Sequence, residues 1–440
     1  MYLVKSGLEE VLGGIENHIS VYREAIEAEK RQWNREAIVE VQNRQLRAVI
    51  QNAVKNTTFY SRHFHDANIL PEDIHTVMDL ARIPILTKQN LRAEFRNMIT
   101  REYPLNKCNR NRTSGSTGEP VVNLQDYVLH NRVFSINSLR QRWGWGHVEP
   151  RRMLHIMPRR FHGDAPEFPE FRIDLNGLNK VWMFHPTEDS NDYVTVLNHC
   201  KPDIIYGNPY LLLNMAKQLS GESRDFNKPE VIYSSFELLD NPSRLFLSSV
   251  FDCRICDIYG FSEVGDVAWE CPEGHGHHIN EDYLVVEVLN SQGQPVIGEK
   301  GEIVVTSFYN DAMPIIRYRV GDIGVMETDP CPCGRHTHRL KQIHGRNVDF
   351  ISLPSGVRIS PYDIMNILDL PSIARFQVIQ EAVTTLRIKY IQTQQQNIVP
   401  LLHERLVKKL GHDMNFIFEE VEHIAVTGSD KIRTVLSYIE

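Results

Sequence analysis

Residues 257–265 read DIYGFSEVG, a short apolar run that passes into Tyr-Gly and then into Ser-Glu. If the run is a strand, Glu263 lies at its carboxyl end, which is where open α/β sheets bind ligands. A carboxylate there could hold a magnesium ion beside nucleotide phosphates. An exposed loop glutamate is the plainer alternative, and this stretch alone leaves it open.

The sequence around this stretch has the pattern of an α/β domain. Between about residues 150 and 310, short β-rich runs alternate with polar or helical segments. They read RRMLHIMP, DIIYG, VIYSS, ICDIYG, YLVVEVL and EIVVTSF. Alternating strands and helices favour an α/β core, so we expect a large domain with β-sheets flanked by helices.

The two ends of the chain differ from this central part. We expect a helical segment over about residues 1–60, with Ile15, Ile19, Tyr22 and Ile26 on a face that packs. After residue 345 the pattern changes to two helical and three strand-like runs, enough for a small α+β domain. The sequence therefore predicts a large domain at 1–345 and a small one at 346–440.

The composition is that of an ordinary globular protein. Of 440 residues, 42% are hydrophobic and 24% are charged. With 48 Lys and Arg against 56 Asp and Glu, the net charge is −8. This balance gives no electrostatic basis for binding a nucleic acid, so we expect no such partner.

We expect a cytoplasmic protein with no membrane partner. The start, MYLVKSGLEEVLGG, lacks the basic-then-apolar pattern of a signal peptide, and no apolar run approaches the roughly 18–20 residues that cross a bilayer. In the cytoplasm the seven cysteines should be thiols or metal ligands rather than disulfides.

The stretch TSGSTGEP, residues 113–120, predicts an anion-binding loop. Its glycines let backbone N–H groups approach an anion closely, and its hydroxyl side chains add donors. It is not a Walker loop, because Glu119 follows Gly118 where that motif needs lysine. A flexible Ser/Gly linker is the alternative.

Charged residues also stand at later turns. The run that begins at Gly301 ends in Gly-Asp at Asp322, which could accept both hydroxyls of a ribose, although a plain turn is the alternative. Arg346 follows a glycine and precedes Asp349. Lys431 lies in the tail GSDKIRTV, where a single lysine is normally a solvated charge.

A group of cysteines and histidines predicts a metal site. Thiolates and imidazoles at short spacings in a cytosolic protein suit a tetrahedral structural zinc. The ligands we expect are Cys271, His278, Cys331 and Cys333. Four protein ligands leave no open position, so no chemistry is expected at the metal.

Other residues could replace these ligands. The alternatives for the imidazole are His275, His277, His336 and His338. Cys253 and Cys256 form a competing pair, but on an apparent buried strand they should behave as small apolar residues. Surface histidines and buried thiols without a metal are the alternative for the whole group.

Together and in this order, these stretches resemble the adenylate-forming superfamily of acyl-CoA synthetases and nonribosomal adenylation domains. Three phrases are particularly similar to its phenylacetate-CoA ligase-like branch: IPILTKQNLR at 83–92, AMPIIRYRVGDIG at 312–324, and CPCGR at 331–335 followed by GRNVD. The resemblance extends from about residue 40 to the end of the chain.

The resemblance implies a nucleotide site that both domains share. Glu263 matches the acid that helps to hold magnesium, Asp322 the ribose ligand, and Arg346 the arginine at the hinge before a mobile C-terminal lid. Lys431 matches the lid lysine that bridges the substrate carboxylate and ATP. The phosphate-binding loop would comprise Thr113, Ser114, Gly115, Ser116, Thr117 and Gly118. The other expected nucleotide ligands are Ser235, Phe236, Glu237 and Tyr259.

On the substrate side, the resemblance places the acid near Tyr206, Asn208, Gly260 and Phe261, residues that could equally be core packing. The chain also departs from the family pattern at three positions. Glu119 stands where many members have lysine, Val348 interrupts the acidic pair after Gly-Arg, and Asp430 replaces the usual glycine before the catalytic lysine.

The implied activity is ATP-dependent conversion of a carboxylic acid, aryl or arylacetic, to an acyl-adenylate, followed by transfer to the thiol of CoA. A carboxylate has no good leaving group until it is joined to AMP, and Lys431 with magnesium would offset the charge where the two anions meet. The expected cofactors are thus ATP, magnesium, CoA and a structural zinc.

Three other functions are left open by the sequence. The acceptor could be the phosphopantetheine arm of a carrier protein, or the reaction could be an adenylylation without a thioester. The chain could also be a non-catalytic relative that serves polysaccharide synthesis or export. A homodimer is a further possibility.

Overall fold

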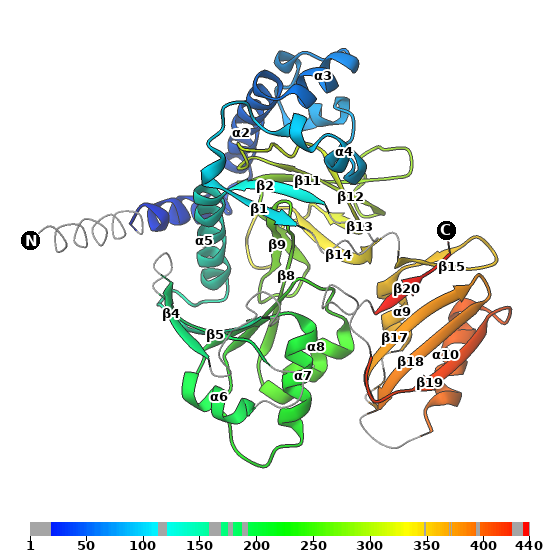
Figure 1. The fold of residues 1–440 in the computed structure, drawn as a ribbon. Helices are drawn as coiled ribbons and strands as arrows, with labels where there is room; N and C mark the ends of the chain where they lie inside the picture. The colour runs from blue at the N-terminus through cyan, green and yellow to red at the C-terminus, as the bar shows by residue number, and fades with distance from the viewer. Residues whose placement is uncertain are drawn as a thin grey trace, which may run out of the picture.

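The computed structural model describes residues 19–112, 121–157, 169–174, 179–186, 192–346, 349–368, 370, 372–392, 397–424 and 434–439. Figure 1 shows a large body organised around one long, twisted sheet, with a small four-stranded unit beside it. The α/β class predicted from the sequence, with a large domain and a small C-terminal domain, is confirmed.

The large sheet has 12 strands among the described residues. Across the sheet they follow the order β11 (Leu284–Leu289), β12 (Lys300–Ser307), β13 (Tyr318–Glu327), β14 (Arg339–Arg346), β10 (His277–Ile279), β9 (Gly265–Glu270), β8 (Arg254–Phe261), β7 (Val231–Ser235), β6 (Ile204–Gly207), β3 (Arg152–Ile156), β5 (Asn179–Phe184) and β4 (Glu170–Asp174). From β8 to β5 all neighbours are parallel, so their carboxyl ends lie along one edge.

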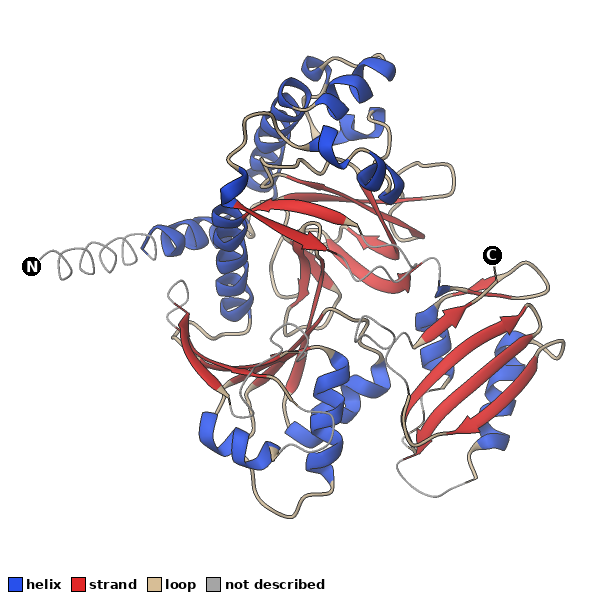
Figure 2. Cartoon of the chain, in the orientation of Figure 1, coloured by secondary structure: helices blue, strands red, loops and turns tan. Residues whose placement is uncertain are grey.

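Helices cover the sheet in two groups (Figure 2). The first group, near the antiparallel half, comprises α2 (Arg35–Asn56), α3 (Thr58–Asp66), α4 (Lys88–Ala93) and α5 (Tyr127–Gly144). It also includes short 3₁₀ turns at Pro71–Asp73, Val77–Arg82, Phe95–Met98 and Leu105–Lys107, and the paired strands β1 (Cys108–Arg112) and β2 (Val122–Asp126). The second group, on the parallel half, comprises α6 (Tyr193–Cys200), α7 (Pro209–Ser220) and α8 (Asn241–Phe251).

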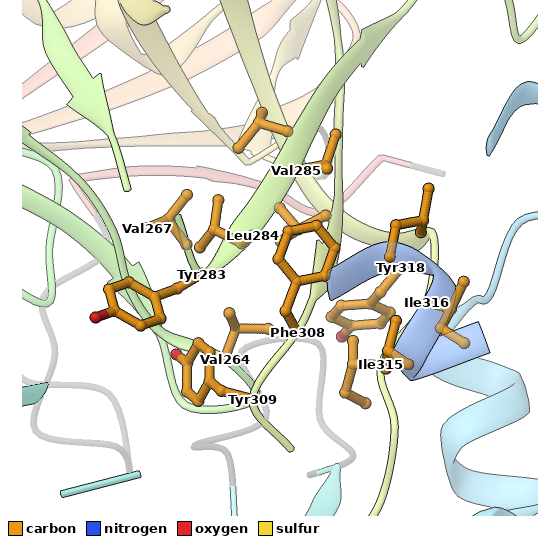
Figure 3. Close-up of a cluster of buried hydrophobic side chains, with 14 of the residues drawn as sticks. Val264, Val267, Tyr283, Leu284, Val285, Phe308, Tyr309, Ile315, Ile316 and Tyr318 are labelled. Carbon is orange, nitrogen blue, oxygen red and sulfur yellow. The ribbon is translucent and has the colours of Figure 1, made fainter. Parts of the chain in front are cut away.

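Each half of the body has its own apolar core. Figure 3 shows part of the first core, where Phe308 and Leu284 lie beside Tyr318. The second core joins α6, α7 and α8 to the parallel strands and includes Leu212, which is fully buried. A further buried cluster, which includes Ile258 of β8 and Trp269 of β9, lies beside residues of the first core such as Val267 and Ala268.

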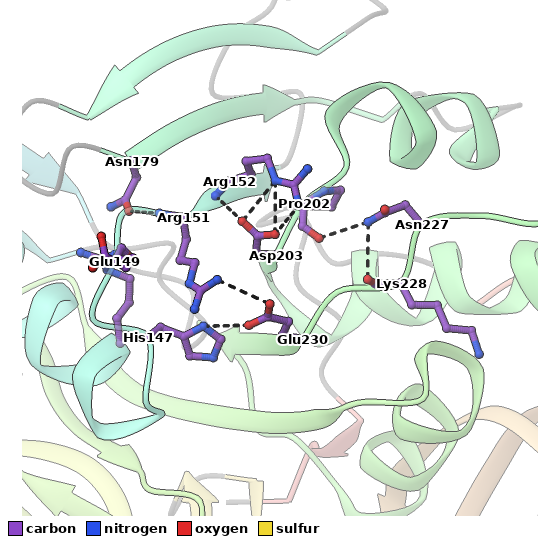
Figure 4. A network of polar contacts seen from close by, with 11 residues as sticks. His147, Glu149, Arg151, Arg152, Asn179, Pro202, Asp203, Asn227, Lys228 and Glu230 are labelled. Atoms are coloured by element: carbon purple, nitrogen blue, oxygen red, sulfur yellow. Dashed lines mark hydrogen bonds and ion pairs between the residues drawn. The ribbon is translucent and has the colours of Figure 1, made fainter.

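Ion pairs tie the parallel strands at their amino ends (Figure 4). Asp203 pairs with Arg152 at the start of β3, and Glu230 Oε2 lies 3.1 Å from His147 Nδ1. Arg151 donates its backbone N–H to the Asn179 side chain at the start of β5. The opposite, carboxyl edge of these strands is where open α/β sheets bind ligands.

The N-terminal helix differs from its prediction in two ways. Residues 19–31 are helical, but the helix stops and α2 starts afresh, because the Asn34 side chain caps α2 by accepting from the Ala37 N–H. The packing face is correct only in part: Tyr22 packs against the core, but Ile19 and Ile26 are exposed, whereas Val21 and Ala25 are buried. Ile15 lies outside the described residues. None of the described helices is both long and apolar enough to span a bilayer.

The residues after Arg346 form a separate sheet with its own core. Its strands follow the order β19 (Asn415–Glu420), β18 (Thr385–Gln392), β17 (Ile373–Ala382) and β20 (Val435–Ser437), with α9 (Pro361–Ile367), α10 (Val399–Leu410) and the small pair β15 (Ile351–Ser352) and β16 (Arg358–Ile359). Several contacts join this unit to the large body, among them an ion pair and a cation–π contact. Lys300 pairs with Asp363 at 3.2 Å, and the Arg375 guanidinium lies 4.2 Å from the ring centroid of Tyr210.

Candidate functional site

Two carboxylates at the carboxyl edge of the sheet are each held by a tyrosine. The Tyr259 hydroxyl donates to Asp322 Oδ2 at 2.7 Å, and the Tyr318 hydroxyl donates to Glu263 Oε1 at 2.8 Å. These residues come from β8, the turn after it and β13, so the structure brings together DIYGFSE and the later Gly-Asp turn. Glu263 is only 5% exposed, which excludes the exposed loop glutamate that the sequence left open.

Arg346 completes one side of this group. Its Cα is the register partner of that of Asp322 in the β13–β14 ladder. Gly345, next to it, has a φ of +84°, a conformation that side chains rarely adopt, and Leu238 and Pro361 lie 3.4 Å from where its Cβ would be. The chain thus leaves the large body at a tightly shaped point beside Asp322.

Lys88 is a cation that the sequence reasoning did not assign to the site. Its segment runs beside β13, where Leu86 N–H donates to the Arg317 carbonyl at 2.9 Å. The ammonium lies 3.3 Å from where a Cβ on Gly321 would be. Burial and Arg346 lower the pKa of Lys88, while Glu263 and Asp322 act to raise it. Lys88 lies in IPILTKQNLR, a stretch whose resemblance to the family is already visible in the sequence. Nothing in this stretch reveals that it lies beside residues more than 170 positions away.

The loops after β6 and β7 are tied to one another. Asn208 caps α7 by accepting from Leu211 N–H, and its amide donates to Glu237 Oε1 at 3.2 Å. Ser235 donates to the Ile258 carbonyl at 3.2 Å. Phe236 is exposed and has a φ of +75°, which is unusual for a bulky residue. An exposed aromatic ring held in this way is suited to stacking on a planar ligand.

The residues predicted to lie near the acid differ in their surroundings. The Tyr206 ring lies 5.6 Å from that of Phe236 in an edge-to-face arrangement. Phe261 packs between Tyr259 and Tyr318, at 6.2 and 6.3 Å between ring centroids. Gly260 serves the backbone, because a Cβ there would meet the Gly265 carbonyl oxygen at 2.5 Å.

Several predicted residues lie outside the described part of the chain. They are Thr113, Ser114, Gly115, Ser116, Thr117, Gly118 and Lys431, and the departures Glu119, Val348 and Asp430. Their roles stay predictions.

The four predicted metal ligands converge at the far end of β9. The ligand atoms of Cys271, His278, Cys331 and Cys333 all lie within 4.8 Å of one another. The Sγ atoms of Cys271 and Cys331 are 3.7 Å apart, and Cys333 Sγ is 3.4 Å from His278 Nε2. Two thiolates on one tetrahedral zinc would be about 3.8 Å apart, given Zn–S bonds of about 2.3 Å, so the donor set fits this metal.

Neighbouring groups orient the same cluster. His278 Nδ1 lies 2.7 Å from the Thr337 hydroxyl, which leaves Nε2 to face the sulfurs. A hydrogen bond from Cys271 and the nearby His278 lower the pKa of Cys333. Among the alternatives, His277 instead pairs with Asp257 at 2.9 Å and His338 with Glu281 at 3.2 Å. Cys256 is buried on β8 and contacts the Glu270 carbonyl.

Comparisons with known proteins give relatives across almost the whole chain. A family model of the CapK C-terminal domain matches residues 351–438. Protein CapK of Staphylococcus aureus is 24% identical over 427 residues, which are 92% of this chain and 90% of that protein. Phenylacetate-coenzyme A ligase of Escherichia coli (strain K12) is 27% identical over 334 residues, which are 73% of this chain and 74% of that enzyme.

Solved structures share the fold. One is 2-hydroxyisobutyryl-CoA ligase in the postadenylation state in complex with 2-HIB-AMP, which superposes with a TM-score of 0.74 at 19% identity. The match covers 91% of this chain and 89% of that one, so the likeness includes both the large body and the C-terminal unit.

Proposed function

Because the chain belongs to the adenylate-forming superfamily, in its phenylacetate-CoA ligase-like branch, we propose that it uses ATP to activate a carboxylic acid as an acyl-adenylate. The observation that carries this proposal is the convergence of Glu263 and Asp322, each held by a tyrosine hydroxyl, with Lys88 and Arg346. Two fixed acceptors beside two cations suit a ribose and a phosphate chain with its metal ion.

Each residue of the group has a role in this proposal. Asp322, fixed by Tyr259, accepts the ribose hydroxyls. Glu263, fixed by Tyr318, helps to hold magnesium, which when bound offsets charge on the phosphates. Lys88 and Arg346 bring positive charge to the same place. The phosphate-binding loop at 113–118 and Lys431 complete the site by resemblance.

The proposed chemistry runs in two steps. A carboxylate oxygen of the acid attacks the α-phosphorus of ATP, and pyrophosphate leaves with the electron pair of the broken bond. The sulfur of a thiol, most simply CoA, then attacks the acyl carbon and gives up its proton to solvent, and AMP leaves with the electron pair of the broken C–O bond. In the first step an anionic carboxylate must approach an anionic phosphate, so the cations near Asp322 supply electrostatic help there. An aryl or arylacetic acid is the substrate class that the branch suggests.

The cysteine and histidine cluster has a separate part in the proposal. We assign it a structural zinc, supported by four convergent donors that leave no position for substrate. It lies at the opposite end of β9 from Gly265, and so it would brace the sheet that carries the nucleotide site.

A non-catalytic relative is the second candidate. Two observations favour it: Asp430 replaces a glycine beside Lys431, and the family that matches residues 351–438 is that of the CapK C-terminal domain. A carboxylate next to Lys431 could draw its ammonium away from the nucleotide.

ATP–pyrophosphate exchange, measured with CoA omitted over a panel of aromatic and aliphatic acids, tests the proposal. We expect exchange that depends on one class of acid, and Asp322→Ala should abolish it, while the exposed Lys107→Ala should not. Lys431→Ala should remove exchange but leave thiolysis of a supplied acyl-adenylate largely intact. Bound ATP with no exchange across the panel would favour the non-catalytic candidate. Adding CoA or a carrier protein then separates the acceptors.

A further inference from the structure

Two polar side chains lie against Gly265, just after the Glu263 turn, and a third belongs to the next residue; the nucleotide chemistry uses none of them. Asp266 of β9 has its Cα opposite that of Gly260 of β8. The Tyr309 hydroxyl and the His130 Cε1 lie 3.1 and 3.2 Å from where a Cβ on Gly265 would be. Together they form a polar cluster, which we define as Asp266, Tyr309 and His130, drawn from β9, α5 and the loop after β12.

These groups lack the partners that their surroundings call for. The Asp266 carboxylate accepts one hydrogen bond, from Gln141 Nε2 at 3.3 Å. No described residue hydrogen-bonds to the Tyr309 hydroxyl, and the buried His130 Nδ1 has no hydrogen-bond partner in the described part of the chain. Buried polar groups in native proteins are nearly always satisfied by protein, water or a ligand, so these groups have the capacity to bind a polar ligand.

Asp266 is largely removed from water, but a ligand could still reach it. Burial raises the pKa of its carboxyl group to about 6, although the side chain keeps some exposure to solvent. Burial also lowers the pKa of His130, so this imidazole tends to be neutral. Figure 3 shows the Tyr309 ring beside Val264, with its hydroxyl directed away from Ile315 and Ile316 of the apolar core.

The polar cluster adjoins the side of the site predicted to bind the acid. Burial and then the charge of Asp266 raise the pKa of Tyr206, and the same two causes raise that of Tyr309. Asp266 therefore lies within electrostatic reach of both tyrosines. Tyr206 in turn contacts Phe236 and His155, with ring centroids 5.6 and 5.1 Å apart.

We propose that the polar cluster binds a hydroxyl or amino substituent on the acid, which donates a hydrogen bond to the Asp266 carboxylate. This inference rests on the proposed function and refines its substrate class. An acid with a plain phenyl or alkyl tail would cover Asp266 and leave its charge unpaired, which is unfavourable. An acid that carries a donor satisfies the carboxylate, and Tyr309, whose pKa burial and the charge of Asp266 raise, can bond to the same substituent.

Binding of matched acids tests the inference without turnover. Calorimetry would compare phenylacetate with 4-hydroxy- and 4-aminophenylacetate, and butyrate with 4-hydroxy- and 4-aminobutyrate. We expect at least one donor-bearing acid to bind about 10-fold or more tightly than its parent. Asp266→Leu should remove that preference, and Tyr309→Phe, which deletes only a hydroxyl, should reduce it. Glu299→Leu, at an exposed position, is the matched control.

The outcomes separate this inference from the proposed function. Parent acids that bind as tightly as all their donor-bearing partners overturn the inference, as does a preference that survives Asp266→Leu in a folded protein. Binding by none of the six acids also counts against it. Tighter binding of a donor-bearing acid without pyrophosphate exchange supports the inference and rejects the proposed acyl-adenylate formation. Pyrophosphate exchange without a preference for donor-bearing acids supports acyl-adenylate formation and rejects the inference.

Discussion

At the residue scale, the informative side chains are ionisable groups that folding partly buries away from water. Lys88 is the clearest case, because burial opposes its charge while Glu263 and Asp322 favour it. Removing a lysine from water costs free energy, which nearby carboxylates offset only in part. In the proposed site a negatively charged ligand would offset the rest of that cost.

Replacing Lys88 should harm catalysis and spare the fold. We expect Lys88→Ala to lower pyrophosphate exchange by about 10- to 100-fold, the range for losing a hydrogen bond to a charged group, with Lys88→Arg partly active. Thermal stability should stay the same or rise, since burial lowers the pKa of Lys88 and its charge opposes folding. Exchange kinetics and melting curves, with Lys107→Ala as the exposed control, check both parts. A variant that loses stability and activity together would indicate a purely structural lysine.

Ionisation of the Asp266 carboxyl group should lower the free energy of unfolding of the ligand-free protein as the pH rises. Its pKa is about 6 when folded and 3.8 in its ordinary state, so the folded form disfavours the ionised carboxylate. Stability is then lost as the pH rises through about 4 to 6, by about 1 kcal/mol after allowing for the partial exposure of the side chain. Asp266→Asn should unfold at a higher temperature than the parent at pH 8, and the gap should close at pH 4. A gap that does not change with pH would contradict this assignment.

At the scale of elements, the sequence predicted what is local and periodic. The strand that ends in Tyr-Gly-Phe-Ser-Glu and the alternation of strands with helices were correct, because burial on both faces leaves a clear apolar pattern. The helix face was wrong at Ile19 and Ile26, because spacing identifies a face but not the neighbour that covers it. Lys88 was missed for a similar reason: its contacts with Glu263 and Asp322 depend on how its segment lies beside β13.

The cysteine and histidine cluster joins the turn after β9, strand β10 and the turn that holds Cys331 and Cys333, and should contribute to stability through a metal. We expect Cys331→Ser to lower the bound zinc and the melting temperature together, because a lost thiolate weakens a closed four-ligand site. Metal analysis and thermal unfolding with and without a chelator measure the two effects. Cys108→Ser, on β1 and outside the cluster, is the matched control. An unchanged zinc content, or no zinc in the parent protein, would reject the proposal.

At the scale of the whole molecule, the C-terminal unit contacts the segments after β6 and β7, near the predicted nucleotide ligands Ser235, Phe236 and Glu237. Arg375 of β17 stacks on Tyr210, and its surroundings include the charges of Glu237 and Asp240. Tyr210 lies two residues after Asn208, which itself bonds to Glu237. The position of the C-terminal unit is thus coupled to the loops after β6 and β7, while Arg346 marks the point where the two parts join.

Removing this stacking contact should loosen the C-terminal unit without unfolding it. A cation–π pair at a partly exposed site contributes about 0.5–1 kcal/mol, so Arg375→Ala should shift the balance between docked and undocked units by about 2- to 5-fold. Limited proteolysis near residues 346–350 should become faster by a similar factor, and small-angle scattering should show a more extended average shape. Arg387→Ala is the matched control, because Arg387 pairs only with Glu381 and Glu419, both within its own unit, among the residues described. Equal effects of the two substitutions would mean that general weakening of the C-terminal unit, and not the contact with Tyr210, governs its docking.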